Sequence, residues 1–234
     1  MIDETIDEVF REHRLGPAVF AVIGPNGSGK SSAVAAMGIE DPGGGLSLDR
    51  IRIDNDSGKL LLRFVNPDDF SMQIREANPD LTQRQSDEAA AALAERKRRE
   101  LADSRSDFGF ETVGSHESKL QFLHDLKGLG YYIAVLFVGT EDPSINKRRV
   151  TERVSAGGHD VDPEKIEPRY KRTMGLLAQY YDIADFIAVY DNSIDIVAGG
   201  KPRLLVTKGT DRKPQTTNHC DDVRWIHTYL LDAI

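Results

Sequence analysis

The chain has 234 residues, of which 39% are hydrophobic and 29% charged, and its formal net charge is −8. This length suits one sizeable α/β domain and is short for two independent cores. An acidic chain without a basic tract is not expected to bind nucleic acid. Its single cysteine, Cys220, excludes an intramolecular disulfide framework and a multi-cysteine zinc site.

The sequence carries no pattern for membrane insertion or secretion. Residues 1–5 include two acidic side chains and lack the apolar segment of a signal peptide. No apolar run approaches the length that spans a bilayer. We therefore expect a cytoplasmic protein without a membrane partner.

In the first third of the chain, apolar segments alternate with segments that favour turns. Helical spacing of apolar residues predicts a short helix over 3–13, and the apolar stretch 18–23 predicts a buried strand followed by a helix that ends near Gly38. Alternating residues over 46–53 and 59–65, around a turn at 55–58, predict a β-hairpin whose second arm joins the main sheet.

The rest of the chain alternates strands and helices. Its pattern predicts strands at 108–113, 131–138, 185–190 and 204–206, and helices at 84–104, 116–128, 143–156, 164–181 and 221–232. This order is typical of an α/β, doubly wound, mainly parallel sheet. We expect a single domain over 1–234, with 39–62 as a hairpin insertion and 143–181 as a helical lid that carries arginines.

Residues 24–31 read G-x-x-x-x-G-K-S between the first strand and its helix. In that context the glycines let consecutive N–H groups point at one anion at a helix N-terminus. Lys30 would reach the β- and γ-phosphates, and the Ser31 hydroxyl would bind Mg²⁺. The sequence therefore predicts a site for ATP or GTP, formed by Gly24, Pro25, Asn26, Gly27, Ser28, Gly29, Lys30, Ser31 and Ser32.

Acidic residues follow two predicted strands. Because ligands of open α/β sheets bind beyond the carboxyl ends of the strands, Asp68, Asp69 and Glu111 are candidates for chemistry. Phosphoryl transfer to a hydroxyl needs a carboxylate base, and we assign this role to Asp68, with Asp69 as the alternative. Asp68 could instead cap a helix. Glu111 is assigned to acceptor binding or to the magnesium water shell, or to a structural hydrogen bond at the strand end.

Two basic helices are predicted around a Gly157-Gly158 hinge. The first bears Lys147, Arg148, Arg149 and Arg153, and the second bears Arg169, Lys171 and Arg172. Arginine binds phosphate oxygens in a bidentate manner, so these helices would close over phosphates. The alternative is a solvated charged surface paired with Glu152, Glu164 and Glu167.

Several motifs occur together in one order. They are the P-loop at 24–32, Phe-Val-Asn-Pro-Asp-Asp-Phe at 64–70, Phe-Glu-Thr-Val-Gly-Ser at 110–115, the arginine segment 149–159 ending in Gly-Gly-His, residues 169–172, and Tyr-Asp-Asn-Ser at 190–193. The chain thereby resembles the zeta-toxin-like P-loop kinases, over most of residues 18–195.

The resemblance implies a small-molecule kinase that uses ATP or GTP with Mg²⁺. It implies that Asp68 is the base and that Arg153, with Arg169 or Arg172, neutralises the transferred phosphoryl group. Asp69, Glu111 and Thr112 would bind the acceptor, for which UDP-N-acetylglucosamine is the family's example. An antitoxin protein is the implied partner. Residues 190–193 would lie near the nucleotide base or shape the lid contact, or form an ordinary turn.

Two departures bear on the acceptor. The hairpin over 39–62 reads as an insertion, and Asn-Pro-Asp-Asp is not the Asp-x-Asp form of the plasmid-borne toxins. A regulatory ATPase that acts through a protein partner is the alternative function. A polynucleotide or nucleoside kinase is a third hypothesis, which the acidic net charge disfavours.

Overall fold

The computed structural model describes residues 16–36, 49–54, 58–158, 160–195, 201–208 and 212–234. The expected helix over 3–13, the helix end near Gly38 and the hairpin turn lie outside the described residues. The chain forms two compact units, the first from Met1–Val19 and Ser31–Glu111, the second from Phe20–Lys30 and Thr112–Ile234. The expectation of a single domain stays a prediction.

In the first unit the strands lie in the order β2 (Asp49–Asp54), β3 (Gly58–Val65) and β4 (Phe108–Thr112). β2 and β3 are antiparallel, with Asp54 opposite Gly58, whereas β3 and β4 are parallel. The two arms of the predicted hairpin are thus confirmed, and its second arm, β3, also pairs with β4.

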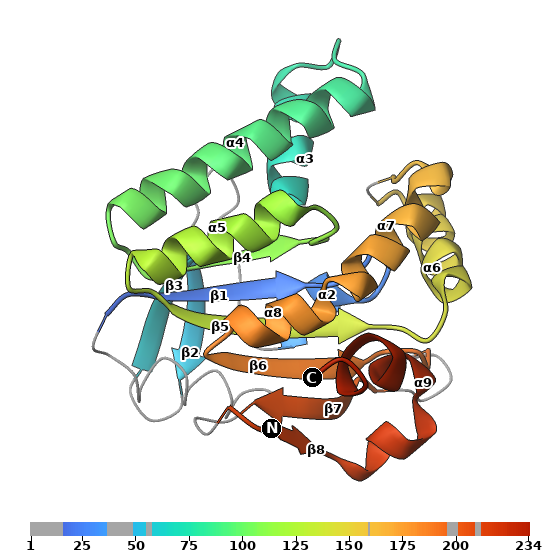
Figure 1. Cartoon of the computed structure of the whole chain (residues 1–234). Coiled ribbons are helices and arrows are strands. Elements are labelled where there is room, and N and C mark those ends of the chain that lie inside the picture. Colours follow the sequence, from blue (N-terminus) through green and yellow to red (C-terminus); the bar gives the residue numbers. More distant parts are fainter. Residues whose placement is uncertain (1–15, 37–48, 55–57, 159, 196–200, 209–211) are drawn as a thin grey trace. The chain divides into compact units, whose positions relative to one another are not determined.

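The first unit also contains the helices α3 (Pro67–Ala77) and α4 (Gln83–Asp103), which pack against each other (Figure 1). The sequence analysis predicted α4 and missed α3. Asn66 is the N-cap of α3, since its side chain accepts the backbone N–H of Asp68 at 3.1 Å. The alternative of Asp68 as the N-cap is therefore wrong. Asp68 occupies the first turn instead, where the helix dipole favours an acidic residue.

The second unit begins within β1 (Ala18–Ile23), at Phe20, and its strands lie in the order β1, β5 (Tyr132–Gly139), β6 (Phe186–Asp191), β7 (Arg203–Lys208) and β8 (Pro214–Thr216). β6 runs parallel to β5, whereas β7 and β8 add antiparallel neighbours at the edge. β8 was not predicted. β1 is buried along its whole length, and so is β5 after its first residue, as expected of strands covered on both faces.

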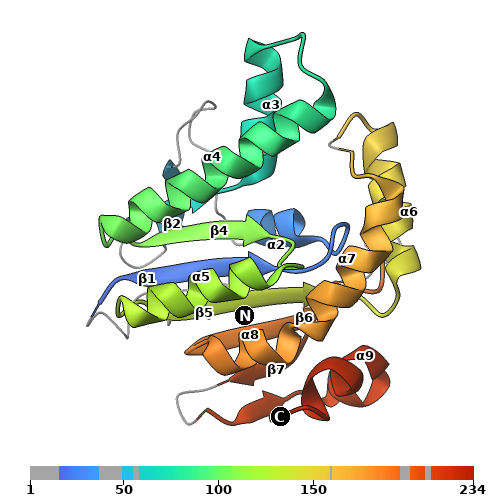
Figure 2. The same ribbon diagram turned by 45° about the horizontal axis from the view of Figure 1, so that its top comes forward.

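Helices cover these strands, so the α/β class is confirmed (Figure 2). α2 (Lys30–Ala36) follows β1, and the helices of the second half are α5 (Glu117–Gly128), α6 (Pro143–Ser155), α7 (Pro163–Gly175) and α8 (Leu177–Ile183). The helical segment predicted over 164–181 is confirmed, but it is divided into two helices, α7 and α8, which separate at Leu176. The predicted C-terminal helix near 221–232 is found as two consecutive helical segments, α9 (Arg224–Ile226) and the π-helix η3 (His227–Leu231), which follow the 3₁₀ helix η2 (Asn218–Asp222).

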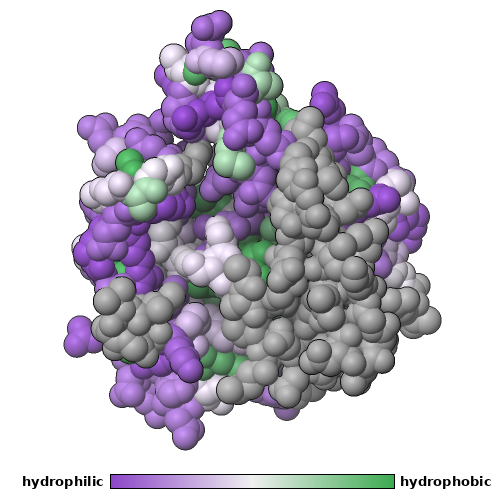
Figure 3. Space-filling model, turned by 180° about the vertical axis from the view of Figure 1, so that it is seen from behind, coloured by the Kyte–Doolittle hydropathy of each residue, from purple (hydrophilic) through white to green (hydrophobic). Residues whose placement is uncertain are grey.

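The large hydrophobic residues that are exposed lie far apart in the sequence: Met72, Leu129, Val154, Ile194 and Ile234. On the face shown in Figure 3 the described residues are mostly hydrophilic, with small apolar areas between them. Among the described helices, none combines the length and the hydropathy needed to cross a membrane.

Candidate nucleotide site

The P-loop, residues 24–31, leads from β1 into α2 as the motif requires. Gly27 and Gly29 have φ angles of 74° and 94°, in the left-handed region that glycine adopts without strain. Lys30 is buried, with 7% of its surface exposed, and its Nζ donates to the carbonyl oxygen of Pro25 at 3.0 Å. The lysine is therefore folded back over the loop at the start of the helix.

Three glycines of the loop lie where a side chain would collide with a neighbour. A Cβ on Gly24 would lie 2.2 Å from the backbone oxygen of Val138, and a Cβ on Gly27 would lie 2.6 Å from that of Asn146. A Cβ on Gly29 would meet the side-chain nitrogen of Asn192 at 2.3 Å. The close approach of β5, α6 and the segment after β6 thus explains the glycines independently of a ligand.

Two buried asparagines bind the backbone of the loop. Asn146 Nδ2 donates to the Asn26 oxygen at 2.6 Å, and the hydroxyl of Thr140 donates to Asn146 Oδ1 at 2.5 Å. Asn192 Nδ2 donates to the Ser28 oxygen at 2.8 Å. Sequence analysis missed the contact of both asparagines with the loop, because no local pattern reports which distant side chain meets a loop carbonyl.

Two buried polar atoms of the loop have no hydrogen-bond partner among the described residues, namely Asn26 Oδ1 and Ser28 Oγ. A buried polar atom without a partner costs about 1–3 kcal/mol. Because the P-loop backbone curves around this region, a polar ligand such as a polyphosphate with its water would satisfy them. The loop is therefore suited to hold the phosphates of a nucleotide.

Ser31 and Glu111 meet within the first unit. The Ser31 hydroxyl, which is exposed, donates to both carboxylate oxygens of Glu111 at 3.1 Å, and only 7% of Glu111 is exposed. Hydroxyl and carboxylate oxygens are the ligands that Mg²⁺ prefers. Within the described ranges, no group of three or more His, Cys, Asp or Glu could hold a metal. The Ser31 hydroxyl and the Glu111 carboxylate could hold Mg²⁺ only if water and phosphate supplied its remaining ligands.

The two candidate bases lie in the first turn of α3 and are partly buried. Asp69 Oδ1 accepts a hydrogen bond from Asn66 Nδ2 at 3.4 Å, so this carboxylate takes part in the capping turn. Asp68 contributes its backbone N–H to the same turn. Both residues belong to the first unit. The choice between Asp68 and Asp69 as the base stays a prediction.

Thr112 lies at the end of β4, where its hydroxyl accepts the N–H of Gly114 at 3.2 Å. The turn that follows is bound by α7: Arg172 Nε donates to the Ser115 oxygen at 3.2 Å, and Thr173 donates to the Val113 oxygen at 2.9 Å. The Nε of Arg172 therefore already donates to a backbone carbonyl.

Much of the basic surface of α6 and α7 is paired. Lys147 and Lys171 both bind Glu167, at 2.7 and 3.0 Å, and the two ammonium groups lower the pKa of that carboxyl to about 2. Arg148 binds Glu152 at 3.1 Å. The alternative of a solvated, paired surface is thus confirmed for Lys147, Arg148 and Lys171.

Arg153 differs from these residues. Its Nε and Nη2 atoms are buried and have no hydrogen-bond partner among the described residues. Its stem packs on Gly158, where a Cβ would lie 2.7 Å from Arg153 Cγ. Seven residues separate Arg153 from Asn146, so both project from the same face of α6, about 10 Å apart along the axis. The guanidinium therefore shares a helix face with the asparagine that holds the P-loop.

Arg169 is partly buried on α7, and its charge contributes to the lowered pKa of Asp162. The main cause of that lowered pKa is the N–H of Glu164, which the carboxylate accepts as the N-cap of α7. His159, in the loop before α7, lies outside the described residues.

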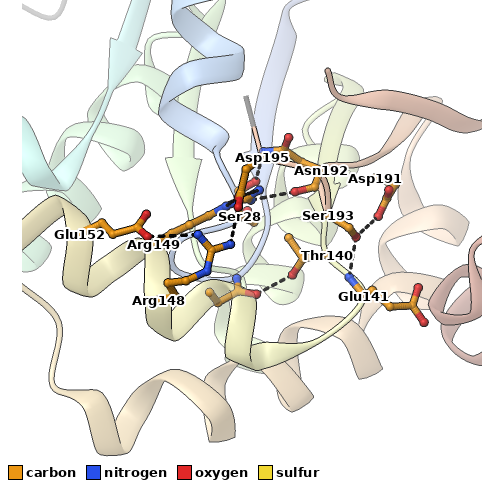
Figure 4. Close-up of polar contacts among 11 residues, drawn as sticks. Ser28, Thr140, Glu141, Arg148, Arg149, Glu152, Asp191, Asn192, Ser193 and Asp195 are labelled. Carbon is orange, nitrogen blue, oxygen red and sulfur yellow. Dashed lines mark hydrogen bonds and ion pairs between the residues drawn. The ribbon is translucent and has the colours of Figure 1, made fainter. Parts of the chain in front are cut away.

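The segment after β6 forms a network of bonds and is more than a turn (Figure 4). Asp191, 1% exposed, accepts from Arg203 at 2.8 Å, from Trp225 Nε1 at 3.0 Å and from the Ser193 hydroxyl. The next residue, Asn192, accepts a bond from Arg149 of α6 at 2.7 Å through its backbone oxygen. Of the alternatives for residues 190–193, the contact with the predicted lid helix is the one supported by these bonds.

Comparisons with known proteins give the fold. No protein-family model matches the chain. No curated protein matches it by sequence either. A chain of the AvrRxo1-ORF1:AvrRxo1-ORF2 complex with sulphate ions matches with a TM-score of 0.63 and 13% identity, over 95% of this chain and 68% of that one. A chain of the same complex with ATP gives a TM-score of 0.63 and 14% identity over the same shares.

A third structure is more distant. A chain of the PezAT chromosomal toxin-antitoxin system of Streptococcus pneumoniae matches with a TM-score of 0.50 and 13% identity, over 98% of this chain and 85% of that one. The chain therefore shares its fold with chains of these two complexes. At such low identity the likeness extends to the fold alone, and the resemblance drawn from the motifs is confirmed at the level of the fold.

Proposed function

We propose that the chain is an ATP- or GTP-dependent kinase that transfers the γ-phosphoryl group to a hydroxyl of a small acceptor. The observation that supports this most is the P-loop itself. It has left-handed glycines, a buried Lys30 at the helix start, and a buried Ser28 hydroxyl without a partner among the described residues. Such a loop binds polyphosphates through its amides and its helix N-terminus.

Residues 24–32 would bind the nucleotide, with Lys30 on the β- and γ-phosphates. Arg153, whose buried nitrogens lack partners among the described residues, would neutralise charge on the transferred group. Arg169 is assigned the same role, and so is Arg172 once it leaves the Ser115 carbonyl. Ser31, with Glu111 through water, would hold Mg²⁺, which supplies positive charge to the phosphate oxygens.

Asp68 is proposed as the base that accepts the proton of the acceptor hydroxyl, with Asp69 as the alternative. Asp69, Glu111 and Thr112 are proposed to bind the acceptor. A UDP-activated amino sugar such as UDP-N-acetylglucosamine is our candidate, and it rests on the resemblance alone. The donor nucleotides are cytoplasmic metabolites, so we place the reaction in the cytoplasm.

The structural relatives support two parts of this proposal. The AvrRxo1-ORF1:-ORF2 complex has been crystallised with ATP, which favours ATP as the donor. Both that complex and the PezAT toxin-antitoxin system contain a second protein. We therefore propose an antitoxin-like protein as a partner, and co-purification from the native source, with and without ATP, is the test.

Nucleotide binding is tested first. Calorimetry with ATP and GTP in the presence of Mg²⁺ should give saturable binding, and Lys30→Ala should weaken it by at least about tenfold, since a charge-assisted contact is worth about 1.5–3 kcal/mol. Saturation with neither nucleotide at millimolar concentration would refute the proposal.

Transfer is tested with γ-labelled ATP and a pool of purified metabolites that includes UDP-sugars. Asp68→Asn should abolish transfer and leave nucleotide affinity unchanged, whereas Asp69→Asn, which keeps the proposed base and alters a proposed acceptor ligand, should retain turnover with a raised KM for the acceptor. Loss of transfer only in Asp69→Asn would reverse the assignment. If label appears only as inorganic phosphate, with no acceptor modified, the alternative of a regulatory ATPase replaces the kinase.

A further inference from the structure

Arg149 lies on the α6 face that meets the P-loop region, yet its donors are already engaged. Its Nε and Nη2 donate to Asp195 Oδ1 at 3.0 and 2.8 Å, and its Nη1 donates to the backbone oxygen of Asn192 at 2.7 Å. Only 16% of its side chain is exposed. All three nitrogens of the guanidinium are thus committed within the second unit (Figure 4).

Asn192, which Arg149 holds by its backbone oxygen, is fixed at two further atoms. Its N–H donates to the Gly139 oxygen at the end of β5, at 2.9 Å. Its side-chain Nδ2 donates to the Ser28 oxygen inside the P-loop, at 2.8 Å, and the residue is 7% exposed. A rotation of Asn192 would therefore shift the carbonyl of Ser28 and, through the same peptide plane, the N–H of Gly29.

α6 consequently contacts the P-loop by two routes. The direct route is the bond from Asn146 to the Asn26 oxygen. The indirect route runs from Asp195 through Arg149 and Asn192 to Ser28, and we name these first three residues the P-loop strut. The two routes reach loop residues on either side of Gly27, so together they fix the curvature of the amides that would face a phosphate.

We infer that Arg149, Asn192 and Asp195 are positioning residues that preorganise the P-loop for a polyphosphate, and that Arg149 is not a phosphate ligand. This inference rests on the proposed function, because it assigns the strut to the nucleotide site. Two arginines of α6 then have different roles: Arg149 orders the P-loop, and Arg153 is the residue proposed to contact the ligand.

The direction in which Asp195→Ala changes the Kd of ATP distinguishes the two possible roles of Arg149. If Arg149 belongs to the strut, Asp195→Ala releases it and raises the Kd of ATP, as Arg149→Ala does, each by about three- to tenfold. If Arg149 is a phosphate ligand held in reserve, Asp195→Ala frees it and lowers the Kd, whereas Arg149→Ala raises it. Asp195→Asn keeps the shape and serves if Asp195→Ala does not fold.

The second experiment uses inorganic tripolyphosphate, which occupies a P-loop without a base or ribose. Asn192→Ala should raise the Kd of tripolyphosphate and of ATP by the same factor, about three- to tenfold, because the lost bond orders the phosphate-binding amides. A loss confined to ATP would mean that Asn192 contacts the base or ribose, and the inference would be wrong.

Ser193→Ala is the matched control. It removes bonds of the same segment, to Asp191 and from the N–H of Glu141, without touching the P-loop. Its Kd for tripolyphosphate should stay within about twofold of the wild-type value, and an increase as large as that of Asn192→Ala would overturn the inference. If the wild-type protein binds neither ATP nor tripolyphosphate, the proposed function fails; if it binds both and Asn192→Ala is unchanged, only the strut fails.

Discussion

Gly27→Ala, compared with Gly157→Ala, tests the contact between the P-loop and α6. Both glycines have positive φ angles, 74° and 83°. At Gly157 no described atom lies within 4 Å of an added Cβ, whereas at Gly27 the backbone oxygen of Asn146 would lie 2.6 Å away. The two variants therefore carry similar backbone strain, and only Gly27→Ala adds a steric clash with Asn146.

The magnitudes follow from this difference. An alanine in the left-handed region costs about 1–2 kcal/mol, and the reduced freedom of the unfolded chain returns about 0.4–1 kcal/mol. These two contributions are similar in both variants and cancel in the comparison. Overpacking against a backbone atom adds about 1–3 kcal/mol for Gly27→Ala alone. We expect its free energy of unfolding to be lower than that of Gly157→Ala by this amount.

Urea unfolding followed by circular dichroism measures both free energies, and the slopes of the two transitions should agree. ATP binding gives an independent reading, since Gly27→Ala should also lose affinity while Gly157→Ala keeps it. Equal destabilisation of the two variants would show that the loop does not lie against Asn146, and the geometry argued for the site would be wrong.

Three further predictions concern other parts of the second unit. Glu167 should titrate near pH 2, so its ion pairs contribute to stability above about pH 4.5 and are lost as the pH falls through 2; an NMR midpoint near 4.5 would contradict the pairs with Lys147 and Lys171. Cys220 is buried and its pKa is raised by desolvation, so a thiol reagent should react at least about tenfold more slowly with the native protein than in urea. Trp225→Phe should lower the free energy of unfolding by about 1–3 kcal/mol, because Asp191 loses one buried donor; an unchanged urea midpoint would exclude that bond.

The sequence predicts the parts of the fold whose cause is local. The P-loop, the hairpin arms and the long helix α4 each carry their signal within a few residues, as glycine positions, alternation and a Thr82–Gln85 capping box. α3 also had such a signal, which was not used: Asn66 as N-cap, Pro67 at the first helical position and two acidic residues in the first turn. That helix was predictable.

The rest depends on partners that are distant in the chain. Asn146 bonds to a P-loop residue 120 positions earlier in the chain, and Asn192 bonds to one 164 positions earlier. No periodicity in the sequence indicates these contacts. The break between α7 and α8 at Leu176 is equally hidden, because Leu176 keeps helical φ and ψ angles and its sequence continues the helical pattern. Which arginine of α6 is paired, and which has buried nitrogens without a partner among the described residues, is likewise decided by packing.

The bonds from α7 and α8 to the backbone have a consequence for how the site could close. Tyr170, Arg172, Thr173 and Tyr180 donate to four carbonyl oxygens, those of Thr140, Ser115, Val113 and Gly114. Swinging these helices outward would break all four bonds at a cost of about 2–6 kcal/mol, so an open form would make up at most a few per cent of molecules. Reorienting the Arg153 guanidinium breaks none of these four bonds, and its Nε and Nη2 have no hydrogen-bond partner among the described residues to lose. If Arg153 engages a phosphate as proposed, it can therefore do so while α7 and α8 stay in place.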